Sequence, residues 1–225
     1  MSGLSEKRLW RCVRAVLGVY AAGLVAFVLW VVLVPAAAHA QTLQPPHVAA
    51  RYKLTLLREA HSQWGLDAPV AALAAQVHQE SAWQPQAVSR VGARGLAQFM
   101  PATSRWWCER ERIAPADCLP HNPAWALRAM VGYDRFLWLR TEARHGDYDR
   151  LWLALRGYNG GEGHVRAEAA TTGLQAPTRA QIDAACGLAR RAAVHCRENL
   201  SYPRRILMEL QPRYAGWGAV WRPAE

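Results

Sequence analysis

An uncharged apolar run divides the sequence into two unequal parts. Residues 15–34 contain no acidic or basic side chain, and a run of this length is long enough to cross a bilayer as a helix. The basic residues before the run are Lys7, Arg8, Arg11 and Arg14. Basic flanks stay on the cytoplasmic side of a membrane, so the sequence predicts that everything after the run is exported.

Two fates are open for residues 1–40, cleavage as a signal peptide or retention as a signal anchor. The length of the run favours an anchor, because the apolar core of a signal peptide has roughly 7 to 15 residues. The segment Ala38-His39-Ala40 has instead the small-x-small pattern of a signal-peptidase site. Residues 41–47 contain a proline pair and are expected to form a linker, and residues 48–225 are expected to form one domain.

The charge of the chain suits an anionic partner. The formal net charge is +10 at pH 7, and a basic surface attracts anions, although it also serves solubility alone. No run of basic residues interleaved with aromatic residues marks a nucleic-acid groove, so no nucleic-acid partner is expected. Export favours the cell wall or an anionic lipid surface. We expect a monomer that contacts the inner membrane if its N-terminal segment is retained.

The cysteines fall into a pattern typical of an exported domain. Cys12 lies on the cytoplasmic side of the apolar run, and the other four form local pairs, Cys108 with Cys118 and Cys186 with Cys196. An oxidising compartment favours disulfides, and of the three possible connectivities we expect the two local ones. No CxxC or HExxH spacing is present, so we expect no metal and no cofactor.

Helical periodicity dominates the exported part, and alternating strand-like runs are scarce, so an all-α fold is expected. Asp67 is predicted to cap a helix with Pro69 in its first turn, and Asn122 with Pro123 is predicted to start another. The other expected helices cover residues 48–64, 101–113, 148–157, 163–171, 178–194 and 202–211, and the helix after Asn122 is expected to reach about Arg144.

Glu80 is the acidic residue whose position is most informative. The apolar stripe of its predicted helix contains Val70, Leu73 and Val77, and the next position on that stripe is Glu80. Desolvation disfavours a charged carboxyl and raises its pKa. A carboxyl that is protonated near neutral pH can donate a proton to a leaving oxygen, as glycosidic cleavage requires. Periodicity also allows an exposed Glu80 at a frayed helix end.

Four motifs follow one another along the chain. Glu80-Ser81 is the first, and the segment GARGLAQFMPAT (residues 92–103) is the second. Tyr158-Asn159 before two glycines is the third, and ENLSY (residues 198–202) is the fourth. In this order they resemble the soluble lytic transglycosylase domain, a lysozyme-like family related to goose-type lysozyme. The resemblance covers roughly residues 54–214.

The resemblance implies a lysozyme-like helical fold and a role for each motif. It implies that Glu80 is the catalytic acid and base and that Glu198 supports the last motif. The residues implied to bind the sugar strand are Ser81, Gly95, Leu96, Gln98, Tyr158, Asn159 and Tyr202. By itself Gln98 is equally consistent with a satisfied interior amide, and Asn159 with a turn.

Three positions depart from the family pattern. Ala97 stands in place of a methionine, Gly157 in place of an alanine, and Pro203 in place of the hydrophobic residue usual after the tyrosine, which leaves the start of the local helix uncertain.

The sequence is also rich in tryptophan, and we expect most of these side chains to be buried in the core and not to stack on sugar rings. The ones considered are Trp83, Trp106, Trp107 and Trp138.

The implied activity is the cleavage of the MurNAc-GlcNAc β-1,4 bond of peptidoglycan in the periplasm. In this family the C6 hydroxyl of muramic acid attacks C1, which leaves a 1,6-anhydro end without a second carboxylate, water or metal. One alternative is a hydrolytic goose-type lysozyme or phage endolysin on the same fold, with Glu162 as the residue that activates water. Another is a non-catalytic scaffold that binds the cell wall or belongs to a secretion apparatus.

Overall fold

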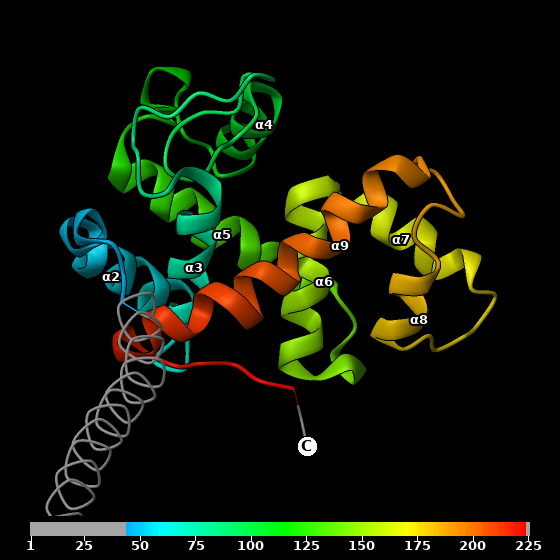
Figure 1. Ribbon diagram of the computed structural model, residues 1–225. Coiled ribbons are helices and arrows are strands. Elements are labelled where there is room, and N and C mark those ends of the chain that lie inside the picture. Colours follow the sequence, from blue (N-terminus) through cyan, green and yellow to red (C-terminus); the bar gives the residue numbers. More distant parts are fainter. Residues whose placement is uncertain (1–43, 224–225) are drawn as a thin grey trace, which may run out of the picture. The chain divides into compact units, whose positions relative to one another are not determined.

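The computed structural model describes residues 44–223 of the chain. These residues form helices and connecting loops (Figure 1). Across the described residues β-pairing is limited to two isolated bridges, Val88 with Arg94 and Arg94 with Phe99, which confirms the all-α class. The predicted signal peptide or anchor and Cys12 lie outside the described residues. Within residues 44–223 no helix has the length and apolar character needed to span a membrane.

The first helices end at residues that leave the helical conformation. A 3₁₀ turn, η1 (His47–Tyr52), leads into α2 (Lys53–Trp64), which ends at Gly65 with φ +86°. The next helix is α3 (Val70–Ser81). Asp67 was predicted to cap it, and this was wrong. Pro69 occupies the cap position itself and no side chain caps α3, so Asp67 lies too early in the chain.

The two following helices match their predicted starts but end early. Helix α4 (Pro101–Arg110) stops before Ile113 because Arg112 has φ +56°, and the short turn η2 (Pro115–Asp117) follows. Helix α5 (Pro123–Arg140) stops before Arg144 because Thr141 is extended, and η3 (Ala143–His145) follows it. The predicted cap of α5 is confirmed, since the side chain of Asn122 accepts hydrogen bonds from two backbone N–H groups.

The C-terminal half differs more from the predicted pattern. Helices α6 (Gly146–Gly160) and α7 (Glu162–Thr171) lie where helices were expected. Helix α8 (Arg179–Ala184) is much shorter than the predicted 178–194, because the chain leaves the helix for a loop with Gly187 at φ +81° and returns through the short turn η4 (Ala193–His195).

The last helix begins earlier than predicted. Helix α9 (Cys196–Arg204) starts six residues before the expected 202, so Pro203 lies inside it and not at its start. Proline lacks the N–H that would continue the regular pattern. The chain goes on as a π-helical segment, η5 (Arg205–Leu210), and a 3₁₀ segment, η6 (Gln211–Trp217). In Figure 1 this path runs across α6 and on towards α3.

Helix α3 lies in the middle of the hydrophobic core. Residues 70–77 of this helix are all buried, and many of them are alanines, so neighbouring backbones can approach closely. Helix α3 packs against η5 and η6, while α6 packs against α5, α7 and α9. The predicted catalytic motifs lie on α3, α6 and α9. Helices α6 and α9 contact each other, and η5 contacts both α3 and α9.

Both predicted local disulfides are present. The Cα atoms of Cys108 and Cys118 are 6.1 Å apart, and those of Cys186 and Cys196 are 5.8 Å apart. Each bond closes a loop at a sequence separation of 10. The first loop connects the end of α4 to η2, and the second connects α8 to the start of α9.

Candidate active site

Glu80 lies in the last turn of α3. The helix ends there because Ala82 and Trp83 both take left-handed conformations, with φ +48° and +65°. The indole of Trp83 is fully buried and its N–H donates to the hydroxyl of Tyr214 at 2.7 Å, which fixes the turn. Glu80 is thus held beside a rigid turn, partly buried, and does not lie on a frayed end.

Tyr202 contacts the Glu80 carboxyl from α9. Its buried hydroxyl donates a hydrogen bond to Oε1 of Glu80. The pKa of Glu80 is raised from 4.5 to about 7. Burial is the largest cause, the hydrogen bond from Tyr202 lowers the pKa, and the negative charge of Glu198 raises it. The group therefore has similar populations of acid and carboxylate near neutral pH.

Ser81 and Tyr158 attach the segment of residues 92–99 to the helices. The hydroxyl of Tyr158, on α6, donates to the carbonyl oxygen of Ala97 at 2.7 Å, and that of Ser81 lies 2.9 Å from the carbonyl oxygen of Leu96. Burial raises the pKa of Tyr158 well above its usual value, so its hydroxyl stays protonated. Both predicted residues thus hold the backbone of this segment at Leu96 and Ala97.

Within this segment, Gly95 and Gln98 have structural contacts of their own. Gly95 has φ +76°, and a Cβ atom there would overlap the carbonyl oxygen of Pro120. The side-chain nitrogen of Gln98 donates to the carbonyl oxygens of Gly95 at 2.9 Å and Ala87 at 3.2 Å. Leu96 is fully buried. Contact between these residues and a sugar stays a prediction.

The last motif contributes a residue that the sequence did not single out. Asn199 is buried on α9, and its amide nitrogen donates to Oδ1 of Asn159 at 3.1 Å and to the carbonyl oxygen of Arg156 at 2.9 Å. Glu198 is exposed and acts on the site through its charge. The position of Asn199 directly after Glu198 in the motif was the only sequence signal available.

Asp134 is a second buried carboxyl that sequence reasoning missed. It lies on α5 and is fully buried. Its Oδ1 accepts from the side chain of Gln76 at 3.2 Å, and its Oδ2 has no partner within the part of the chain described. Gln76 is one helical turn before Glu80 on α3. Burial raises the pKa of Asp134 well above its usual value, and the charge of Glu80 raises it further, which favours the protonated acid.

Glu162, the predicted water-activating residue of the alternative hydrolase, is held by arginines. Its carboxylate accepts from Nε of Arg140 at 2.8 and 3.0 Å, and Nε of Arg166 lies 3.1 Å away. Glu162 lies in the first turn of α7, and its carboxylate is thus paired with two guanidinium groups.

Most of the tryptophans considered above belong to the core. Trp83 and Trp107 are buried, and Trp138 is partly buried against the core. Trp106 is the most exposed of the four, at 41%. It packs edge-on against Tyr133, with ring centroids 5.8 Å apart.

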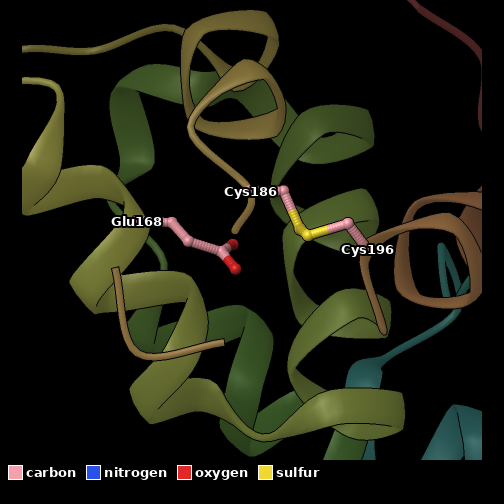
Figure 2. A group of neighbouring side chains, drawn as sticks. All are labelled: Glu168, Cys186 and Cys196. Carbon is pink, nitrogen blue, oxygen red and sulfur yellow. A yellow bond between two sulfur atoms is a disulfide. The ribbon is translucent and has the colours of Figure 1, made fainter. Parts of the chain in front are cut away.

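One group of side chains in the described part of the chain has the spacing of metal ligands. Glu168, Cys186 and Cys196 offer atoms within 4.8 Å of one another (Figure 2). The two sulfurs are bonded to each other, and the two oxygens of Glu168 accept hydrogen bonds from Arg156 and Arg191. All these atoms are already bonded or hydrogen-bonded within the protein, so with the disulfide formed the group is a structural cluster.

A helical domain that presents one glutamate at the end of a buried helix, beside a tyrosine from a distant helix, has the architecture of the lysozyme-like class. Residues 55–179 match the model of the family described as the Transglycosylase SLT domain. This match covers more than half of the chain, and the chain belongs to this family.

Known relatives agree with this assignment. The membrane-bound lytic murein transglycosylase F of Alteromonas mediterranea is 33% identical over 117 residues, which are 52% of this chain and 24% of that protein. The chain thus spans about a quarter of the length of this relative. The 70 kDa soluble lytic transglycosylase of Escherichia coli superposes with a TM-score of 0.57 at 20% identity, over 75% of this chain and 25% of that one. An inactive glutamate-to-glutamine mutant of the lytic transglycosylase Slt of Pseudomonas aeruginosa superposes with a TM-score of 0.54 at 22% identity, over 75% of this chain and 25% of that one. At these identities the solved structures show the fold.

Proposed function

We propose that the chain is a peptidoglycan lytic transglycosylase, which cleaves the MurNAc-GlcNAc β-1,4 bond and leaves 1,6-anhydro-MurNAc ends. Family membership and the names of the relatives support this proposal. The observation that carries it is the single carboxyl of Glu80, whose pKa is raised to about 7 and which a buried tyrosine contacts. Such a group is able to give a proton and to take one back at neutral pH.

In the first step the protonated Glu80 donates its proton to the bridging oxygen. The bond from C1 of MurNAc to this oxygen breaks, and the GlcNAc side leaves with a free hydroxyl. The Tyr202 hydrogen bond stabilises the carboxylate that forms on Glu80. The pKa of Tyr202 is raised well above its usual value by burial and by the charge of Glu80, so its hydroxyl remains a donor throughout.

In the second step the Glu80 carboxylate accepts the proton of the C6 hydroxyl of the same MurNAc. The C6 oxygen bonds to C1, which closes the anhydro ring and restores the protonated acid. Nucleophile and electrophile belong to one molecule, so proximity assists the step. No water is consumed.

Hydrolysis on the same fold is the rival reaction, and it requires a second, ionised carboxylate near the sugar. The carboxylate of Glu162 is engaged by Arg140 and Arg166, and Asp134 is buried with a raised pKa, which disfavours its carboxylate form. Both observations support transglycosylation. Digestion in ¹⁸O-labelled water distinguishes the two reactions, because hydrolysis introduces the label at the new end and transglycosylation does not.

The main experiment is digestion of purified sacculi followed by mass spectrometry of the products. We expect anhydro ends from the wild-type protein and a rate lower by about 10²- to 10⁴-fold for Glu80→Gln, as for the loss of a general acid and base. Glu109→Gln is the matched control, because Glu109 is exposed on α4 and is not among the groups that shift the pKa of Glu80, so this variant should retain the activity. Products with reducing ends throughout, or an unchanged rate for Glu80→Gln, would overturn the proposal.

We also propose that the domain works in the periplasm as a monomer, exported by its N-terminal segment and using no metal. The basic flank of residues 1–14, the two disulfides and the membrane-bound relatives support export. Residues 1–40 are either cleaved after Ala40 or kept as an anchor. N-terminal sequencing of the protein from washed membranes and from the periplasmic fraction distinguishes the two fates.

A further inference from the structure

Arg191 is a buried arginine in an otherwise exposed loop. It lies between α8 and η4, within the loop that the Cys186–Cys196 disulfide closes, and it is 6% exposed. Its neighbours Arg190 and Ala192 are exposed. The family match ends at residue 179, so this loop lies beyond the part of the chain that the family model describes.

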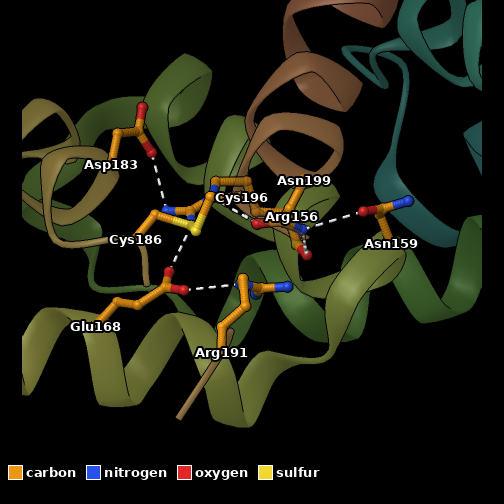
Figure 3. The surroundings of a disulfide bond; sticks show 8 residues. All are labelled: Arg156, Asn159, Glu168, Asp183, Cys186, Arg191, Cys196 and Asn199. Carbon is orange, nitrogen blue, oxygen red and sulfur yellow. Dashed lines mark hydrogen bonds and ion pairs between the residues drawn. A yellow bond between two sulfur atoms is a disulfide. The ribbon is translucent and has the colours of Figure 1, made fainter. Parts of the chain in front are cut away.

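The Arg191 guanidinium belongs to a buried ionic cluster (Figure 3). Its Nε donates to Oε1 of Glu168 at 2.8 Å, and the other oxygen of Glu168 accepts from Arg156. Arg156 also donates to Asp183 at 2.9 Å. Two buried guanidiniums thus face two carboxylates, and the partly exposed Arg179 also binds Asp183. The cluster joins α6, α7, α8 and the disulfide loop. A buried charge that loses its partner is strongly unfavourable, so the cluster fixes these elements relative to one another.

The cluster continues directly into the candidate active site. Nε of Arg156 donates to Oδ1 of Asn199 at 3.0 Å, and Asn199 in turn donates to Asn159. The backbone of Gly160, at the end of α6, is so close to Arg191 that a Cβ atom there would overlap the guanidinium. Arg191 therefore packs against the residue that follows Asn159, and Asn199 is one helical turn before Tyr202 on α9.

We propose that Arg191 is a positioning residue, which holds α9 against α6 and thereby keeps the Tyr202 hydroxyl in contact with the Glu80 carboxyl. The Cys186–Cys196 disulfide keeps the loop closed and Arg191 inserted. Arg191 has no contact with the reacting atoms. The part of this inference that concerns the reaction rate rests on the proposed function, whereas the part that concerns the geometry does not.

The test measures the pKa of the Glu80 carboxyl by NMR titration in the full exported domain. Tyr202, Glu198, Asp134 and Tyr158 are the titratable groups that interact with Glu80. Arg191→Lys keeps the positive charge but replaces the fork of the guanidinium by one ammonium group. Since the Tyr202 hydrogen bond lowers the pKa of Glu80, we expect Arg191→Lys to raise it, and the exposed neighbour Arg190→Lys to leave it unchanged.

A second arm asks whether Arg191 acts through Tyr202. In a Tyr202→Phe background the hydrogen bond is already absent, so Arg191→Lys should give no further shift. An unchanged pKa in Arg191→Lys, or an equal shift with and without Tyr202, would overturn the proposal. If Arg191→Lys does not fold, the Cys186→Ser/Cys196→Ser variant opens the loop with every charge retained, and it should shift the pKa in the same direction.

The activity assay separates this inference from the proposed function. Arg191→Lys should lower kcat with little change in KM, because Arg191 is buried and its contacts are with Glu168 and Gly160. If the wild-type protein formed no anhydro ends, the proposed function would fail while the titration still decided the role of Arg191. A loss of thermal stability without any change in kcat or in the pKa of Glu80 would assign Arg191 a purely structural role and contradict the proposal.

Discussion

The hydroxyl of Tyr202 donates a hydrogen bond to the carboxyl of Glu80, which lies 122 positions earlier in the chain. The two residues come from α9 and α3, so the contact exists only when these two helices are packed into one domain. The acidity of Glu80 is therefore a property of the assembled domain and not of the α3 sequence alone. Changes at Tyr202, and at the charged Glu198 nearby, should alter that acidity in opposite directions.

The pH profile of the reaction is expected to follow Glu80. The first step needs the protonated acid, so kcat/KM should fall as the pH rises through about 7. Tyr202→Phe removes a hydrogen bond that lowers the pKa, and the fall should move to higher pH while the maximal rate drops by roughly 10- to 100-fold. Glu198→Gln removes a negative charge that raises the pKa, so the fall should move to lower pH. Shifts of the two variants in the same direction would contradict this assignment.

Glu80→Gln is expected to stabilise the fold at alkaline pH. The folded-state pKa of about 7 is above the ordinary 4.5. Between these values the unfolded chain has lost its proton and the folded chain keeps it, so the wild-type protein loses stability as the pH rises and the loss levels off above 7. Glutamine does not titrate. The variant should gain up to about 3 kcal/mol relative to wild type between pH 4.5 and 8, as measured by urea unfolding. A difference that is independent of pH would contradict the raised pKa.

Two glycines in the motifs should respond in opposite ways to alanine. Gly95→Ala places a Cβ against the carbonyl oxygen of Pro120 in a left-handed backbone, and we expect a destabilisation of about 3 kcal/mol or more. Gly157 lies inside α6, and the nearest atoms to an added Cβ are 3.6 Å away, an ordinary contact. Gly157→Ala should be neutral or stabilise by up to about 1 kcal/mol. Denaturant titration of both variants makes the comparison.

Asp134→Asn tests the ionisation state of the second buried carboxyl. Burial raises the pKa of Asp134 and so favours the neutral acid, and asparagine has nearly the same shape as that form. The variant should retain most of the kcat of the wild-type protein and the same pH profile. A loss of activity of 100-fold or more, in a variant whose circular dichroism is unchanged, would mean that Asp134 works as a carboxylate. In that case the hydrolytic alternative would gain support.

The sequence predicts the elements that depend on local signals. Asn122 with Pro123 marks the start of α5 because cap and helix are neighbours in the chain, and Gly65 marks the end of α2 for the same reason. The short α8 was missed because its end is set by a disulfide loop. The early start of α9 was missed because no local residue marks it, since its cap position, His195, makes no side-chain cap bond.

The candidate site was predictable where the family motifs name a residue. Glu80 and Tyr202 do lie in contact. The pair of Gln76 and Asp134 was not found, because these residues are 58 positions apart and each looks like an isolated polar residue on an apolar helix. Arg191 gave no signal, since nothing in the sequence distinguishes a buried arginine from its exposed neighbour Arg190.

The turn at Ala82 and Trp83 fixes how far α3 extends beyond its acid. The peptide dipoles of a helix give its last turn a partial negative charge, which disfavours a carboxylate there. By ending α3 one residue after Glu80, the chain keeps this residue at the electronegative end of the helix. A longer α3 would leave Glu80 in the helix interior, where the acid would be stronger and less suited to hold a proton at neutral pH.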